Sequence, residues 1–280
     1  MRHVKMAYGV ALTVCALCVV AAPALAASAS STFNANIPKK TISPEKPAKT
    51  SGRTEETQEF KFGNQKLICQ VWASGQAAME KEGPTALTTG KVEEEHGTTL
   101  EVGIHFQKCG RVVRAVAGEP ARDEYVAANF KGKVTIIYHV NGFGEIIGNG
   151  EGEENEFGKG KNATIRETAA TFKVAASKLC TVIIPEQTVP IKAIKNPEEE
   201  FTSATFSNVF TPTTRKGFVN NEKESLAITN NFKGLTYRFA EETQCDEDEK
   251  SPEGTTGTYK GELNLEIPAG NLGLEETVEA

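Results

Sequence analysis

The chain has 280 residues, of which 39% are hydrophobic and 24% are charged, and its formal net charge is −6. This length is enough for one large domain or for two smaller ones. Because the chain is acidic, it is a poor match for nucleic acid or for an anionic membrane surface, and we expect neither as a partner.

The first 26 residues are typical of a secretory signal peptide. Arg2 and Lys5 make a basic start, an apolar run covers 10–22, and Ala24–Ala26 form a small-residue cleavage site. We therefore expect a mature chain that begins at Ala27 and is secreted or associated with the cell surface. The mature chain has no other segment apolar enough for insertion into a membrane.

The two ends of the mature chain are poor in the residues that form a core. Residues 27–56 are rich in Ser, Thr, Lys and Pro, which predicts a disordered tether. Residues 268–280 contain few apolar side chains and are expected to form a disordered tail.

Between these ends, most segments alternate apolar and polar residues as half-buried strands do. Gly63-Asn64 separates two alternating runs and predicts a hairpin. Two short segments, 75–83 and 119–130, are candidate helices, and neither is long enough to organise a fold. The pattern favours an all-β, sandwich-like fold of one or two units, with a first unit at 57–162 and a second at 163–267. The apolar positions expected to share a face within a strand are Leu100, Val102, Ile104 and Phe106; Val134, Ile136, Tyr138 and Val140; and Tyr259, Leu263, Leu265 and Ile267.

An acidic, glycine-rich loop is predicted at 141–162, at the end of the first unit. Within it, oxygen-bearing side chains recur at alternate positions: Asn149, Glu151, Glu153 and Asn155. Calcium prefers six to eight oxygen ligands from a tightly turning loop. These acids are Glu rather than Asp, and they lack EF-hand spacing. We therefore interpret the segment as a solvated loop, keep calcium as the alternative, and expect no cofactor.

Four cysteines remain after removal of the signal peptide: Cys69, Cys109, Cys180 and Cys245. An even number in an exported protein indicates disulfides, and four cysteines allow three pairings. Cys69 and Cys180 lie in apolar strands, and Cys109 and Cys245 lie at or beyond the ends of other strands. We expect Cys69–Cys109 and Cys180–Cys245, each closing a loop within one half of the chain.

The sequence contains no recognisable set of catalytic residues. It has no G-x-S-x-G, H-E-x-x-H or P-loop motif. His96 falls in a charged turn, while His105 and His139 fall on the polar faces of strands, where histidines are usually solvated. The carboxylates are too numerous for any one pair to stand out as a glycosidase pair.

Two motifs carry a resemblance to a known group of proteins. The first is C-T-V-x-x-P-x-Q, from Cys180 to Gln187, and the second is G-T-Y-x-G-x-L, from Gly257 to Leu263. With Cys245 between them, they resemble uncharacterised secreted β-rich proteins of soil actinobacteria. The resemblance covers about 60–266 and implies a bacterial, exported β-protein. It implies no catalytic residue.

These observations favour a secreted, non-enzymatic protein that acts as an extracellular binding or surface-interaction module for a ligand or protein the sequence does not name. That inference rests on fold analogy. The first alternative is a secreted hydrolase or glycan-active protein whose carboxylate site is not recognisable in the sequence. The second is a secreted protein inhibitor.

Overall fold

The computed structural model describes residues 29–70, 83–114, 123–140, 162–175, 178–191, 203–206, 209–210, 225–241, 245, 254–268 and 270–278. Within these ranges every regular element is a β-strand, which confirms the all-β prediction. A membrane-spanning helix is not found among these residues. The predicted signal peptide and most of the predicted loop at 141–162 lie outside the described ranges.

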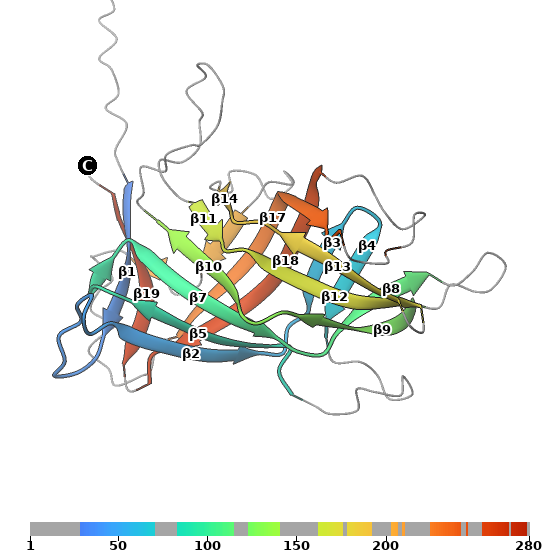
Figure 1. Ribbon diagram of the computed structural model, residues 1–280. Helices are drawn as coiled ribbons and strands as arrows, with labels where there is room; N and C mark the ends of the chain where they lie inside the picture. The colour runs from blue at the N-terminus through green and yellow to red at the C-terminus, as the bar shows by residue number, and fades with distance from the viewer. Residues whose placement is uncertain are drawn as a thin grey trace, which may run out of the picture.

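Eight strands form a closed barrel (Figure 1). Their order is β18-β3-β4-β8-β9-β12-β13-β17, and β17 pairs in turn with β18. The strands are β3 (Gln58–Phe62), β4 (Gln65–Cys69), β8 (Cys109–Arg114), β9 (Asp123–Phe130), β12 (Thr168–Ala175), β13 (Lys178–Ile184), β17 (Ser225–Phe239) and β18 (Gly254–Glu266).

The barrel closes because β17 has partners on both of its edges. Phe239 pairs with Val182 of β13, while Leu235 pairs with Gly257 of β18. A sandwich would instead consist of two separate sheets. The prediction of a sandwich-like fold is therefore corrected to a closed barrel with additional strands.

The additional strands extend the sheet beyond the barrel as an arm. β17 and β18 are long enough to continue past it, and β2 pairs with the far end of β18 at Glu266. From there the arm runs in the order β2-β5-β7-β10-β11-β14. Its strands are β2 (Ala48–Thr54), β5 (Ala86–Val92), β7 (Thr99–Phe106), β10 (Val134–His139), β11 (Asn162–Ile165) and β14 (Gln187–Pro190). A further short strand, β15 (Ser203–Phe206), pairs with β17.

The arm curves back until its last strand reaches β17. There the side-chain amide of Gln187 takes the place of a neighbouring strand. Its Nε2 donates to the carbonyl of Thr236 at 2.9 Å, and its Oε1 accepts from the Thr236 backbone N–H at 2.8 Å. The barrel and the arm are thus both closed against the same hairpin of β17 and β18.

A small second sheet joins the two ends of the described chain. Its order is β16-β19-β1-β6, and its strands are β16 (Val209–Phe210), β19 (Asn271–Val278), β1 (Ala29–Asn36) and β6 (His96–Gly97). β1 and β19 pair along their whole length, and buried Phe33 and Leu274 lie opposite each other.

Two predictions of disorder are wrong. The predicted tether at 27–56 contains β1 and β2, and the predicted tail at 268–280 contains β19. Each segment has too few apolar residues to form a core alone, but paired strands combine their apolar faces. The candidate helix at 119–130 is also wrong, because 123–130 is strand β9, whose extended backbone pairs with β8 on one side and with β12 on the other. The other candidate helix, 75–83, lies outside the described residues except for Gly83.

The barrel takes strands from both predicted units. β3, β4, β8 and β9 come from 57–162, and β12, β13, β17 and β18 come from 163–267. The two segments therefore contribute to one continuous sheet.

Aromatic side chains fill the interior where barrel and arm meet. Phe60 stacks on Tyr259 with ring centres 4.5 Å apart, and it also contacts Phe130 at 4.9 Å and Phe106 at 5.1 Å. Phe106 belongs to the arm, so the core is continuous between the two. The apolar positions predicted to face inward in the strands around 100–106, 134–140 and 259–267 are all buried.

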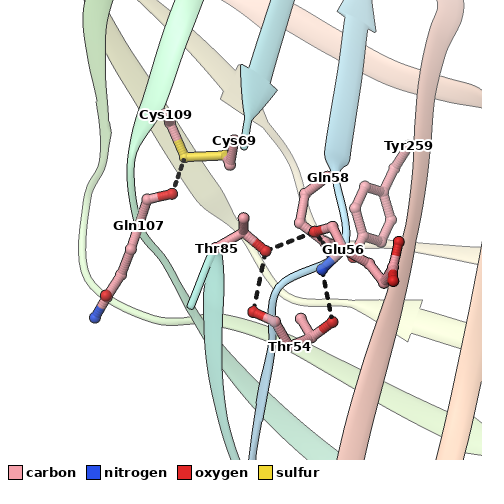
Figure 2. Close-up of a disulfide and its surroundings, with 8 residues drawn as sticks. All are labelled: Thr54, Glu56, Gln58, Cys69, Thr85, Gln107, Cys109 and Tyr259. Carbon is pink, nitrogen blue, oxygen red and sulfur yellow. Dashed lines mark hydrogen bonds between the residues drawn. A yellow bond between two sulfur atoms is a disulfide. The ribbon is translucent and has the colours of Figure 1, made fainter. Parts of the chain in front are cut away.

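The two disulfides are those predicted, Cys69–Cys109 and Cys180–Cys245. Cys69 and Cys109 are directly paired residues of neighbouring strands (Figure 2). All four cysteines are buried. Loops of 40 and 65 residues correspond to about 4 kcal/mol each in the chain-entropy estimate of disulfide stabilisation.

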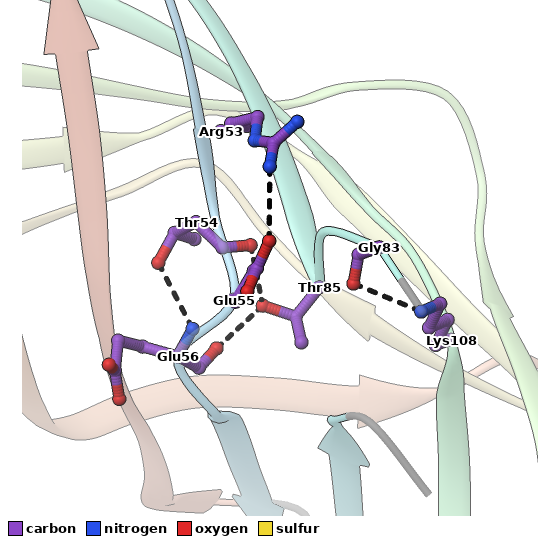
Figure 3. A network of polar contacts seen from close by, with 7 residues as sticks. All are labelled: Arg53, Thr54, Glu55, Glu56, Gly83, Thr85 and Lys108. Carbon is purple, nitrogen blue, oxygen red and sulfur yellow. Dashed lines mark hydrogen bonds and ion pairs between the residues drawn. The ribbon is translucent and has the colours of Figure 1, made fainter. Parts of the chain in front are cut away.

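A short strap, residues 55–57, connects β2 in the arm to β3 in the barrel. Buried Thr85 fixes it: the hydroxyl of Thr85 lies 3.2 Å from the Thr54 carbonyl and 2.6 Å from the Glu56 carbonyl (Figure 3). The Thr54 hydroxyl accepts from the Glu56 N–H. Nearby, Lys108 donates to the carbonyl of Gly83. Hydrogen bonds to the buried Thr85 side chain therefore hold the strap that connects the arm to the barrel.

Gln58, the first residue after the strap, lies in a space that a glycine leaves open. A Cβ on Gly261 would lie 2.0 Å from Gln58 Oε1 and 2.6 Å from its Cδ. Gln58 Nε2 donates to the carbonyls of Glu56 and Glu262, and its Oε1 accepts from the Tyr259 hydroxyl at 2.8 Å. Figure 2 shows Gln58 beside the Tyr259 ring. Gly261 is thus needed for the close approach of a fully buried amide.

We predict that Gly261→Ala destabilises the protein by about 2 kcal/mol, because the added methyl group displaces the bound amide of Gln58. Urea unfolding measures the effect. Adding Gly261→Ala to Gln58→Ala is expected to cost less than adding it to the unmodified protein, since the clashing group is then absent. Equal costs in the two backgrounds would contradict this explanation.

Candidate functional site

The predicted site residues fall in different parts of the structure. The candidate calcium ligands Asn149, Glu151, Glu153 and Asn155 lie outside the described residues. Within the described ranges, no group of three or more His, Cys, Asp and Glu side chains is placed to hold a metal ion. The four cysteines are disulfide-bonded and are therefore not available as nucleophiles or ligands.

Two of the three histidines in the described ranges lie on polar faces of strands in the arm, as predicted. His105 is exposed, and His139 is half-buried with its Nδ1 3.4 Å from the Thr99 hydroxyl. Partial burial lowers the pKa of His139, because it disfavours the charged imidazolium.

The third histidine belongs to a cluster of polar side chains on the small sheet, formed by Asn34, His96 and Glu275. Asn34 lies in the middle of β1 and pairs directly with His96 of β6. On the other side of β1, Glu275 of β19 pairs with Thr32. Side chains two residues apart on a strand share a face, so Asn34 is next to Glu275 on that face.

The carboxylate of Glu275 is the centre of this cluster. Its Oε2 accepts a hydrogen bond from Asn34 Nδ2 at 3.0 Å and lies 3.8 Å from His96 Nδ1. Glu275 and Asn34 are each 6% exposed, whereas the His96 side chain is 50% exposed. A carboxylate removed from water is stable only when such polar partners compensate for its lost hydration.

The arrangement has the components of a proton-transfer pair. A carboxylate and an imidazole are side chains that enzymes use to exchange protons, and half of the His96 side chain is exposed at the surface of the sheet. Asn34 supplies one amide donor to the carboxylate. Among the described residues, these three side chains form the candidate functional site of the protein.

The sequence does not reveal this site for a specific reason. Asn34 falls within the predicted tether, Glu275 falls within the predicted tail, and His96 falls in a charged turn. The available signal was the alternation in 271–275, where Leu272 and Leu274 flank Gly273. It indicates a strand but gives no information about its partner.

Comparison with known proteins identifies no relative. No protein-family model matches the chain, and neither the curated proteins nor the solved structures contain a significant match. The site must therefore be interpreted from its own geometry.

We predict that Asn34→Asp destabilises the protein by about 1–3 kcal/mol at neutral pH, because it replaces a buried donor with a second carboxylate beside Glu275. The loss should shrink near pH 4, where one of two adjacent carboxyl groups takes up a proton. Chemical unfolding at the two pH values measures this. The matched control is Asn36→Asp, an exposed position on the same strand. A similar loss in both variants would show that the contact with Glu275 is unimportant.

His139 gives a prediction of pH dependence. Its pKa is lowered in the folded state, so the unfolded chain takes up a proton first as the pH falls. Folding stability is therefore lost as the pH falls through the unfolded value, about 6.5. We expect His139→Gln to lose less stability between pH 7.5 and pH 5 than the unmodified protein. The difference is small, because solvent screens the half-exposed ring. His105→Gln is the control and should follow the unmodified protein, so identical curves for both variants would contradict the prediction.

Proposed function

We propose that this protein is an extracellular binding or surface-interaction module without enzymatic activity, which recognises its partner through its outer surface. The observation that carries the proposal is the filled interior. An eight-stranded barrel either holds a small ligand inside or fills its interior with side chains. Here Phe60 and Phe106 contact each other, and each also contacts Phe130 and Tyr259 where barrel and arm meet, which favours recognition on the outside.

The chemistry of the described residues supports the same proposal. Two buried disulfides are compatible with an extracellular protein, where thiols are oxidised. They also cross-link a sheet that is already closed, and rigid surfaces of this kind lose little conformational entropy on binding. The proposed partner is an extracellular ligand or protein, and neither nucleic acid nor membrane insertion is part of the proposal.

A second candidate function follows from one observation, the contact of buried Glu275 with His96. This pair is suited to general acid–base catalysis if a substrate reaches the exposed imidazole. It supports the alternative of a secreted hydrolase or glycan-active protein.

One experiment separates the two functions. The mature protein is incubated with isolated bacterial cell walls, with chitin and with cellulose, and both retention on the solid and release of reducing sugar or peptide are measured. Glu275→Gln and His96→Ala are tested beside it, with Asn36→Asp as a folded control. We expect retention on at least one surface without release of product.

The other outcomes contradict all or part of the proposal. Release of product that Glu275→Gln abolishes would establish the hydrolase. If the protein is neither retained on these solids nor releases product from them, a surface-interaction role on these solids is excluded. The partner would then have to be soluble.

A further inference from the structure

The outer face of the barrel carries four lysines on neighbouring strands, Lys61, Lys66, Lys233 and Lys260, which we call the lysine cluster. Lys61 of β3 pairs directly with Lys66 of β4 on one side and with Thr258 of β18 on the other. Thr258 pairs in turn with Lys233 of β17, and Lys260 follows two residues later on the same face of β18. The residues on either side of Lys61 and Lys66 are buried, so these two side chains point away from the core.

Three lysines of the cluster surround one carboxylate, that of Glu59. The Nζ atoms of Lys61 and Lys66 lie 3.4 and 2.8 Å from the carboxylate oxygens. On the other edge of β3, Lys260 pairs directly with Glu59. Burial acts to raise the pKa of Glu59, but the hydrogen bonds and charges of Lys66 and Lys61 outweigh it, so the pKa is lowered. The carboxylate therefore stays ionised, and the group keeps a surplus of positive charge in a chain whose formal net charge is −6.

A second pair of opposed lysines, on the arm, shows how this fold neutralises such a pair. Lys49 of β2 pairs directly with Lys91 of β5. There the Lys91 ammonium group has two carboxylates within reach, Glu93 at 2.9 Å and Glu101 at 3.4 Å. Like charges directly opposite each other destabilise a sheet, and sequences break such local rules mainly at functional sites. The surplus of positive charge on the barrel is therefore suited to binding an anionic partner.

The lysine cluster is narrow, which limits the kind of anion that it fits. Acidic side chains border it, because Glu262 follows on the same face of β18 and the strap before β3 carries exposed Glu55 and Glu56. A bilayer surface or a DNA duplex is broad enough to meet these acids as well, and the acidic chain as a whole repels it. Single-stranded nucleic acid binds by stacking its bases on aromatic side chains. In the described part of the chain the exposed large apolar side chains are Leu87 and Leu179, and neither is aromatic.

We propose that the lysine cluster binds a linear anionic polysaccharide of the cell surface, whose carboxylate or phosphate groups pair with the lysine ammonium groups. Binding of this kind rests on the surface-interaction function proposed above and specifies its partner. Neighbouring strands lie about 4.8 Å apart, so the row from Lys233 to Lys66 spans about 14 Å across four strands. Charges spread over that distance match an extended chain with repeated negative groups better than they match one small anion.

Polygalacturonate and its methyl ester test the lysine cluster, because the two polymers share a backbone and differ in charge. Binding of each polymer to the mature protein is measured by titration calorimetry at low and at high salt. We expect polygalacturonate to bind at low salt and to lose about tenfold in affinity at high salt, because salt screens contacts between exposed charges. The methyl ester should not bind. Equal binding of both polymers, no binding of either, or tighter binding of a DNA duplex than of polygalacturonate would overturn the proposal.

Two double variants show whether binding takes place at the lysine cluster. Lys61→Gln with Lys66→Gln removes two ammonium groups and should weaken polygalacturonate binding about tenfold, since two ion contacts are lost. Lys49→Gln with Lys91→Gln is the matched control, because it changes the net charge equally on the arm and should leave the affinity within about twofold. Glu59→Gln removes the shared carboxylate and should strengthen binding. Circular dichroism checks that each variant is folded. Equal losses in the two double variants, or weaker binding by folded Glu59→Gln, would contradict the site.

Retention on isolated cell walls distinguishes failure of the lysine cluster from failure of the proposed function. We expect the unmodified protein and the Lys49→Gln Lys91→Gln variant to be retained, and the Lys61→Gln Lys66→Gln variant to be lost. If all three are retained equally, the surface-interaction function stands and the lysine cluster is refuted as its site. If the unmodified protein binds polygalacturonate but is not retained on cell walls, the cell surface is refuted as the source of the polysaccharide.

Discussion

The pairing of β17 on both of its edges is the constraint on which the rest of the structure depends. An antiparallel sheet ends in free edges unless its last strand finds its first, and free edges promote aggregation. β17 meets β13 on one edge and β18 on the other, which closes the barrel, and the excess length of the same hairpin supports the arm. This arrangement also sets the location of the aromatic core. Phe60, Phe106 and Tyr259 contact one another where the barrel and the arm share the β17–β18 hairpin.

Two glutamine side chains complete the closure where backbone pairing ends. Gln187 bonds to both backbone groups of Thr236, and Gln58 occupies the space above Gly261 while it bonds to two carbonyls. An amide suits this task because it presents a carbonyl acceptor and N–H donors, the same kinds of group that a strand edge presents. Gln187, Gly261 and Tyr259 are also residues of the two sequence motifs, C-T-V-x-x-P-x-Q and G-T-Y-x-G-x-L. In this structure these three residues have structural roles.

The small sheet, unlike the barrel and the arm, is built mainly from the two ends of the described chain. It brings together β1 and β19, which lie at opposite ends of the described chain, and it buries Glu275 between Asn34 and His96. A buried carboxylate is costly, and its position beside an exposed imidazole gives this sheet a chemical character that the barrel and arm do not show. The two functions considered above therefore require different properties of Glu275. A binding module requires only that the buried carboxylate be stable in the fold, whereas a hydrolase requires that it exchange a proton.

The local structure follows from the pattern of residues along the chain. Alternation at 100–106, 134–140 and 259–267 identified the strands and their buried faces, because side chains on a strand point to opposite sides with a period of two. Gly63-Asn64 specified the hairpin, where Gly63 has a φ of 59°, and the positions of the cysteines on strands gave both disulfides. Only the tertiary structure decided how the strands combine. Alternation does not name a strand's neighbour, so the closure at β17, the mixing of strands from both halves and the pairing of β1 with β19 could not be derived. The terminal segments look disordered because each has few apolar residues, and the candidate site is hidden with them. Its three residues meet only when β1 pairs with one strand about 60 residues away and with another about 240 residues away in the chain.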